Sequence, residues 1–213
     1  MKVNQQVLIV GGGVAGLEAA KNLSQQGYVT YVIEKSGQLG GHTKKLYKTW
    51  QGEFIKDYFD NLMDDINDET QILYWLNAQI LSVEGSIGNF RTTILSNGQK
   101  RILSHGVVII ASGASQYIPA EYLYGKSDRV MTSLELEQKL SNNTDFKSYK
   151  TIAFVQCVGS RNEKRPYCSR VCCTQSIKNA ILLKQMDAGR QIYILYRDIR
   201  TYGMREDLYR AAR

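Results

Sequence analysis

The sequence predicts an α/β protein made of two strand–turn–helix–strand units. Near the N-terminus, the apolar run Val7–Val10 leads into a glycine-rich turn, an amphipathic segment and a second apolar run, Tyr28–Ile33. The same order recurs later, where Thr151–Gln156 and Gln191–Tyr196 flank a segment with apolar residues three and four apart. Short β-branched runs indicate buried strands, and the longer period indicates a helix. Strands that alternate with helices predict Rossmann-like βαβ units with parallel sheets.

The first turn matches the pattern G-x-G-x-x-G through Gly11, Gly13 and Gly16. The first glycine permits a tight turn, the second lets backbone approach a pyrophosphate, and the third lets the helix pack close to the strand. The N-terminus of the helix then faces the phosphates. Glu34 follows the second strand and is placed to accept hydrogen bonds from an adenosine ribose. The turn therefore predicts a dinucleotide site, with a glycine turn that binds nothing as the alternative.

The residues between the two units are expected to complete the first domain. A helix is predicted over Gln51–Asn67, and an Asn97-Gly98 dipeptide predicts a hairpin turn. Further strands are predicted over 71–75, 78–83, 89–95, 99–103 and 107–110. The predicted domains are 1–118, a connector over 119–150 with a polar linker at 141–150, and a second domain over 151–213.

All four cysteines lie between positions 157 and 173, with the spacing C-x10-C-x3-C-C. Cys157 follows a predicted strand, and Cys168, Cys172 and Cys173 lie where a helix over 174–186 is expected to start. A helix N-terminus lowers a thiol pKa, and four thiolates are the ligand count of a cubane iron–sulfur cluster. Spacing alone leaves open a zinc site, redox thiols, two disulfides and core cysteines without a function.

Cys172 and Cys173 are adjacent, and adjacent residues on a helix point about 100° apart. Both can ligate one group only if the helix begins at this pair or is distorted there. We therefore predict that the first regular turn starts near Cys172 and not near Cys168.

The composition is that of an ordinary globular protein, with 43% hydrophobic and 22% charged residues. The formal net charge is +7, and arginines that alternate with core-like residues dominate the last part of the chain. This alternation favours a solvated face or an anionic partner surface over nucleic acid. A signal peptide and a membrane span are not expected, and the reduced cysteines indicate the cytoplasm.

Four segments resemble the A subunit of heterodisulfide reductase, which is a flavin and iron–sulfur protein of methanogens. They read VLIVGGGVAGLEAAKNL, EKSGQLGGH, AFVQCVGSRNEKRPYCSRVCCTQSIKNAILLK and ILYRDIRTYG. The resemblance implies a thioredoxin-reductase-like fold of the two-dinucleotide-domain type, C-terminally incomplete here. It implies electron transfer between FAD and a [4Fe–4S] cluster in a larger bifurcating complex. Its implied partners are the other subunits and ferredoxin or hydrogenase-type donors and acceptors. Family members are usually far longer, so a fragment or short form is expected.

The same resemblance implies which residues bind the two groups. The glycine pair before His42 and the Ala-Ser-Gly strand end at 111–113 are expected near the flavin, although His42 can equally be a plain loop residue. The full expected set for FAD is Gly11, Gly13, Val14, Ala15, Gly16, Glu34, Lys35, Gly41, His42, Ile80, Ala111, Ser112 and Gly113. The expected cluster ligands are Cys157, Cys168, Cys172 and Cys173.

Two other functions remain open on the sequence alone. One is a flavin-linked thiol–disulfide oxidoreductase, and the other is a non-catalytic truncated assembly protein. An acid–base catalyst is not indicated by any residue. A tight NAD(P)H site in the second unit is not expected either, because its turn reads Gln156-Cys157-Val158-Gly159-Ser160 in place of the glycine pattern.

Overall fold

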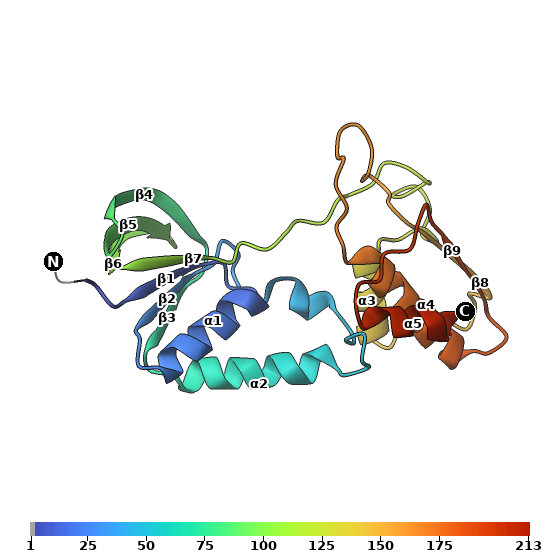
Figure 1. The fold of residues 1–213 in the computed structure, drawn as a ribbon, viewed down its shortest axis with the longest axis horizontal. Helices are drawn as coiled ribbons and strands as arrows, with labels where there is room; N and C mark the ends of the chain where they lie inside the picture. Colours follow the sequence, from blue (N-terminus) through green and yellow to red (C-terminus); the bar gives the residue numbers. More distant parts are fainter. Residues whose placement is uncertain (1–2) are drawn as a thin grey trace. The chain divides into compact units, whose positions relative to one another are not determined.

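The computed structural model describes residues 3–213, and these divide into two compact units. The first unit contains the residues up to Lys44 together with Ile55–Ser115, and the second contains Lys45–Phe54 together with Gln116–Arg213. The segment expected as a connector therefore groups with the second unit. A short stretch from the first half of the chain, Lys45–Phe54, does the same (Figure 1).

A four-stranded parallel sheet forms the centre of the first unit, in the order β3-β2-β1-β7. Its strands are β1 (Val7–Val10), β2 (Thr30–Ile33), β3 (Ile72–Trp75) and β7 (Val107–Ile110). Val7 pairs with Thr30 on one side and with Val107 on the other, so the first residues of these three strands lie side by side. The predicted strand–turn–helix–strand unit is confirmed here, and its glycine turn lies at the carboxyl end of β1.

Helices cover one face of this sheet and a second sheet covers the other (Figure 1). Helices α1 (Val14–Gln25) and α2 (Ile55–Asp68) bury Leu17, Phe59 and Leu62 against β1 and β2. The antiparallel sheet consists of β4 (Ala78–Ser86), β5 (Asn89–Ser96) and β6 (Gln99–His105). Its hairpin turns at Asn97 and Gly98, whose φ values of 49° and 78° confirm the predicted Asn-Gly turn.

The predicted start of α2 was too early. The helix begins at Ile55 because the preceding residues form a turn of their own, with an antiparallel bridge between Lys48 and Phe54. Gly52 lies inside this turn with a φ of 97°, a conformation that glycine adopts without strain. A short 3-10 helix, η1 (Gly41–Lys45), precedes the turn.

The second unit contains a two-stranded parallel sheet, β8 (Thr151–Val155) with β9 (Gln191–Leu195), joined through α4 (Cys172–Met186). This confirms the second predicted βαβ unit. Helix α3 (Ser133–Ser141) packs against α4, and its N-terminus carries a complete capping box formed by Thr132 and Glu135. The core cluster contains Leu136, Leu140, Phe146, Phe154, Ala180 and Leu183.

Two expectations for this unit need correction. The polar linker at 141–150 is not a simple linker, because Phe146 is part of the core. Helix α5 (Arg205–Ala212) packs on α4 and was not predicted. Its many arginines and carboxylates make the helical pattern hard to recognise in the sequence. Within residues 3–213, no helix is both long enough and apolar enough to cross a membrane.

A buried ion pair fixes the Lys45–Phe54 stretch within the second unit. Glu137 on α3 is fully buried and accepts from Lys178 Nζ on α4 at 2.5 Å and from the backbone amide of Tyr47 at 2.9 Å. Lys178 Nζ also donates to the carbonyl of Lys48 at 2.8 Å. Each charge therefore has backbone partners as well as its counterion, which is how a buried pair is tolerated.

Removing one member of this pair should therefore be strongly destabilising. We expect Glu137→Leu to lower the free energy of unfolding of the second unit by about 3 kcal/mol, because it leaves Lys178 buried without a counterion. Urea unfolding followed by Trp50 fluorescence in a Trp75→Phe background measures this. Glu137→Leu with Lys178→Met should lose less than Glu137→Leu alone. Asp187→Ala, which breaks a pair whose Lys150 side chain is 71% exposed, is the control.

Candidate nucleotide and cysteine sites

Two glycines of the first turn are required by packing. Gly11 has a φ of 115°, and a Cβ there would overlap the carbonyl of Ala111 at the end of β7. A Cβ on Gly16 would overlap the carbonyl of Gly11. The turn and the start of α1 therefore lie in direct contact, as the fingerprint pattern predicts.

Gly13 differs from these two glycines because the space beside it is open. Among residues 3–213, nothing lies within 4 Å of the position that a Cβ on Gly13 would occupy. Gly13 is the N-cap of α1, and no described side chain caps that helix. The next two residues, Val14 and Ala15, are exposed. The free amides of the first helical turn therefore border an open space, an arrangement suited to a phosphate group.

The carboxylate of Glu34 is buried beside this turn and is held by three donors. The amide of Gly12 donates to Oε2 at 2.7 Å, and the amide and hydroxyl of Ser36 each lie 2.8 Å from Oε1. Burial is the largest influence and raises the pKa of Glu34, but these hydrogen bonds together hold the pKa below its usual value. Glu34 is therefore ionised at neutral pH, and Oε2 accepts only one hydrogen bond from the described residues.

Two segments expected near a flavin lie beside the glycine turn. The amide of Gly40 donates to the carbonyl of Gly12 at 2.8 Å, and Gly41 lies against Gly13. His42 Nε2 lies 2.7 Å from the carbonyl of Ala114, so Nε2 carries the proton. His42 thus joins η1 to the segment that follows β7, which contains the exposed Ser112 and Gly113. Of the other expected residues, Lys35 is exposed beside Glu34, and Ile80 lies on β4 at a bulge.

The cysteines lie where β8 ends and α4 begins. Cys157 follows β8 with a φ of 60°, and Cys172 and Cys173 are the first two residues of α4. The predicted helix start near Cys172 is confirmed. Cys168 is not part of the helix start, because it lies in the loop four residues earlier. All four are free thiols, so the disulfide alternative does not describe this structure.

The Cys173 thiol is influenced by two of the other thiols. Burial is the main cause that raises the pKa of Cys173, the amide of Arg200 lowers it, and the nearby Cys172 and Cys157 raise it further. Cys168 Sγ accepts from the amide of Arg170 at 3.3 Å. Where thiols lie close together, each thiolate makes ionisation of its neighbours less favourable, and nearby positive charge offsets this effect.

The four thiols match an iron–sulfur cluster in ligand type and number. As they stand, however, no three His, Cys, Asp or Glu side chains of residues 3–213 converge closely enough to hold a metal ion. The donors are thus collected around the N-terminus of α4 without forming a closed ligand set.

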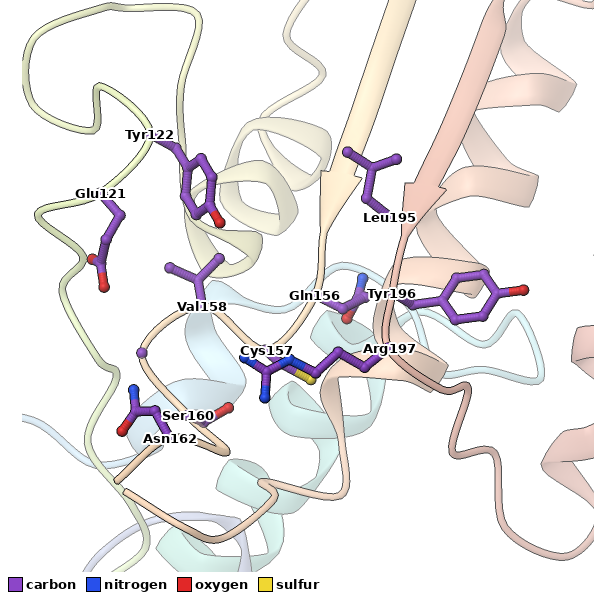
Figure 2. A pocket seen from close by; sticks show the side chains of 11 residues that line it. Glu121, Tyr122, Gln156, Cys157, Val158, Ser160, Asn162, Leu195, Tyr196 and Arg197 are labelled. Atoms are coloured by element: carbon purple, nitrogen blue, oxygen red, sulfur yellow. The ribbon is translucent and has the colours of Figure 1, made fainter. Parts of the chain in front are cut away.

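A cavity of about 350 Å³ lies at the carboxyl ends of β8 and β9, and Cys157 contributes to its wall (Figure 2). Leu195, Tyr196 and Arg197 line it from the end of β9, and Tyr122 lines it from the opposite segment. In open α/β sheets, ligands bind at this end of the strands. Here the cysteine loop occupies that end.

Tyr117 packs against the ten-residue loop between Cys157 and Cys168. Gly159 has a φ of 68°, and a Cβ there would overlap the Tyr117 ring. The guanidinium of Arg165 lies over the same ring, 4.5 Å from its centroid. The ring therefore contacts two residues of the loop. Sequence reasoning missed Tyr117, because it lies in the expected flavin domain and no spacing links it to the cysteines.

The fold and the first site define a Rossmann-type nucleotide-binding protein, with a glycine turn at β1 and an acidic residue at the end of β2. Residues 5–158 match the family described as pyridine nucleotide-disulphide oxidoreductase. The chain belongs to this family.

The resemblance to the A subunit of heterodisulfide reductase is confirmed by curated relatives. The chain is 28% identical to the iron–sulfur A subunit of CoB–CoM heterodisulfide reductase from Methanocaldococcus jannaschii, covering 100% of the chain and 46% of that protein. It is 27% identical to the A subunit of H2:CoB–CoM heterodisulfide,ferredoxin reductase from Methanothermobacter marburgensis, covering 95% and 45%. The chain therefore spans about half the length of these relatives.

A solved structure agrees in fold. L-proline dehydrogenase from P. horikoshii matches with a TM-score of 0.52 at 18% sequence identity, covering 89% of this chain and 35% of that chain. At this identity the match shows the fold alone.

We predict that Gly159→Ala disturbs the cysteine loop. The added Cβ meets the Tyr117 ring, and a left-handed residue other than glycine is itself unfavourable by about 1 kcal/mol or more. Limited proteolysis of the loop and the melting temperature should both reveal the change. Tyr117→Ala combined with Gly159→Ala should recover part of the loss, since it removes the overlap. Equal stability of wild type and Gly159→Ala would contradict the close packing of the Tyr117 ring against Gly159.

Proposed function

We propose that the first unit binds FAD, and the open space beside Gly13 is the observation that carries this. The uncapped N-terminus of α1 borders the space, and Gly41 lies against Gly13 at its edge. A pyrophosphate there would receive the amides of the first helical turn. The ionised Glu34 would accept a ribose hydroxyl at Oε2, which has one further acceptor position.

The remaining residues of the site would position the flavin chain. His42 joins η1 to the segment after β7 through its hydrogen bond to the carbonyl of Ala114, and so would hold the glycine pair near that segment. The exposed Ser112 and Gly113 would offer backbone groups to the flavin. This arrangement uses the same three segments that the sequence resemblance indicates.

We further propose that Cys157, Cys168, Cys172 and Cys173 hold a [4Fe–4S] cluster. The four free thiols, the proximity of Cys157 and Cys172 to Cys173 and the iron–sulfur name of a curated relative support this. Closing the ligand set requires more than one of the four cysteines to move, because no three ligand side chains of residues 3–213 converge as they stand. When bound, the flavin supplies two-electron chemistry and the cluster supplies one-electron chemistry.

Taken together, these sites support an electron-transfer role of the heterodisulfide reductase type. We propose that the protein acts in the cytoplasm, within a larger complex. The proposed partners are other subunits of that complex and ferredoxin or hydrogenase-type carriers. A thiol–disulfide oxidoreductase is less well supported, because a nucleophilic cysteine needs a lowered pKa and the pKa of Cys173 is raised.

Gly13→Val tests the flavin site. The side chain fits the protein, since the space beside Gly13 is open among the described residues, but it fills the position proposed for the pyrophosphate. We expect flavin content after reconstitution, measured by absorbance of the released cofactor, to fall at least tenfold. Gly189→Val, at an exposed turn of the second unit, is the matched control and should retain flavin. Full flavin content in Gly13→Val would refute the assignment.

Single cysteine variants test the cluster. Anaerobically reconstituted wild type should hold about four irons and four sulfides per chain, as ligation by four cysteines implies. Replacing any one of Cys157, Cys168, Cys172 and Cys173 by Ala should remove or degrade the cluster. Iron and acid-labile sulfide analysis, with flavin content as the folding control, gives the readout. An intact cluster in Cys173→Ala would exclude that residue as a ligand.

A further inference from the structure

Arg161 is held in an unusual conformation inside the cysteine loop. Its φ is 56°, in the left-handed region that residues other than glycine seldom adopt. Its side chain is only 21% exposed, although arginine is mostly found at the surface. A left-handed and only partly exposed arginine beside the cysteine thiols requires a physical reason.

The contacts of Arg161 supply that reason. Its Nη1 lies 3.8 Å from Cys157 Sγ and forms an ion pair with Asp198. Its backbone carbonyl accepts from Arg197 Nη1 at 2.6 Å, and its amide donates to the carbonyl of Tyr167 at 3.3 Å. Both the backbone and the guanidinium of Arg161 are therefore fixed relative to Cys157.

Asp198 joins Arg161 to a second cation. Its Oδ2 accepts from Arg200 Nε at 2.9 Å, and the amide of Arg200 faces the Cys173 thiol. The three side chains carry one net positive charge between them. Of these groups, the Arg161 guanidinium approaches Cys157, and the backbone amide of Arg200 approaches Cys173.

The other cations of the same loop do not share this position. Arg165 lies over the Tyr117 ring. Lys164 is exposed, and within residues 3–213 it makes no hydrogen bond or salt bridge. Among the described residues, Arg161 is the cation whose side chain lies within hydrogen-bonding reach of a cysteine sulfur. Sequence alone treats these loop cations as equivalent, and the structure separates them.

We propose that Arg161 is a positioning residue for the cysteine site, fixing Cys157 and favouring the reduced form of the group that the cysteines hold. The inference rests on the proposed cluster. One-electron reduction adds one negative charge to that group, and a nearby cation stabilises the added charge. Its partial burial limits screening by water and salt. Removing the cation should therefore lower the midpoint potential.

The experiment compares Arg161→Gln with Lys164→Gln in the reconstituted full chain. Both variants remove one positive charge from the same loop, but only Arg161 contacts Cys157 and pairs with Asp198. Redox titration followed by EPR should show the reduction equilibrium of Arg161→Gln shifted at least tenfold toward the oxidised form, which is about 59 mV for a one-electron couple. Lys164→Gln should shift it much less, and Arg161→Lys should recover part of the shift.

The outcomes separate the two proposals. Wild type without iron and sulfide overturns the proposed cluster and with it this role of Arg161. Wild type with a cluster, but equal potentials in Arg161→Gln and Lys164→Gln, overturns the role of Arg161 alone. Loss of iron from Arg161→Gln, with flavin retained and iron restored in Arg161→Lys, supports the positioning role. Equal iron loss in Lys164→Gln contradicts it.

Discussion

The crowding of thiols at the N-terminus of α4 is the constraint on which the proposed cluster site depends. Cys172 and Cys173 start the helix, and Cys157 comes close enough to raise the pKa of Cys173. Thiols held this way disfavour one another as anions, so the site is stable in a charged form only if cations compensate. The free amides at the start of α4 supply such compensation, and so do Arg161 and Arg200, which both pair with Asp198.

The same βαβ topology carries two different sites in this chain. In the first unit, the turn after β1 leaves open space beside Gly13, and the helix N-terminus borders it. In the second unit, the turn after β8 also contains a left-handed glycine, Gly159, but the Tyr117 ring fills the space beside it. Both turns follow a strand end, but only the first leaves open space beside a glycine at the helix start, where we propose a nucleotide.

Much of this could be predicted from local patterns. The glycine turn, Glu34 and the start of α4 at Cys172 follow from short-range rules on sterics and helix geometry. The docking of Lys45–Phe54 in the second unit could not be predicted, because its anchors, Glu137 and Lys178, are far away in sequence. The roles of Tyr117 and Asp198 depend on the same kind of long-range contact.

We propose that the four thiols around the start of α4 hold an iron–sulfur cluster in a chain that also binds a flavin. Mössbauer spectroscopy of the wild-type chain, reconstituted anaerobically with isotopically enriched iron and analysed for zinc, tests it most directly. We expect the quadrupole doublets of a [4Fe–4S] centre with cysteine ligation and only trace zinc. A single tightly bound zinc without acid-labile sulfide would contradict it.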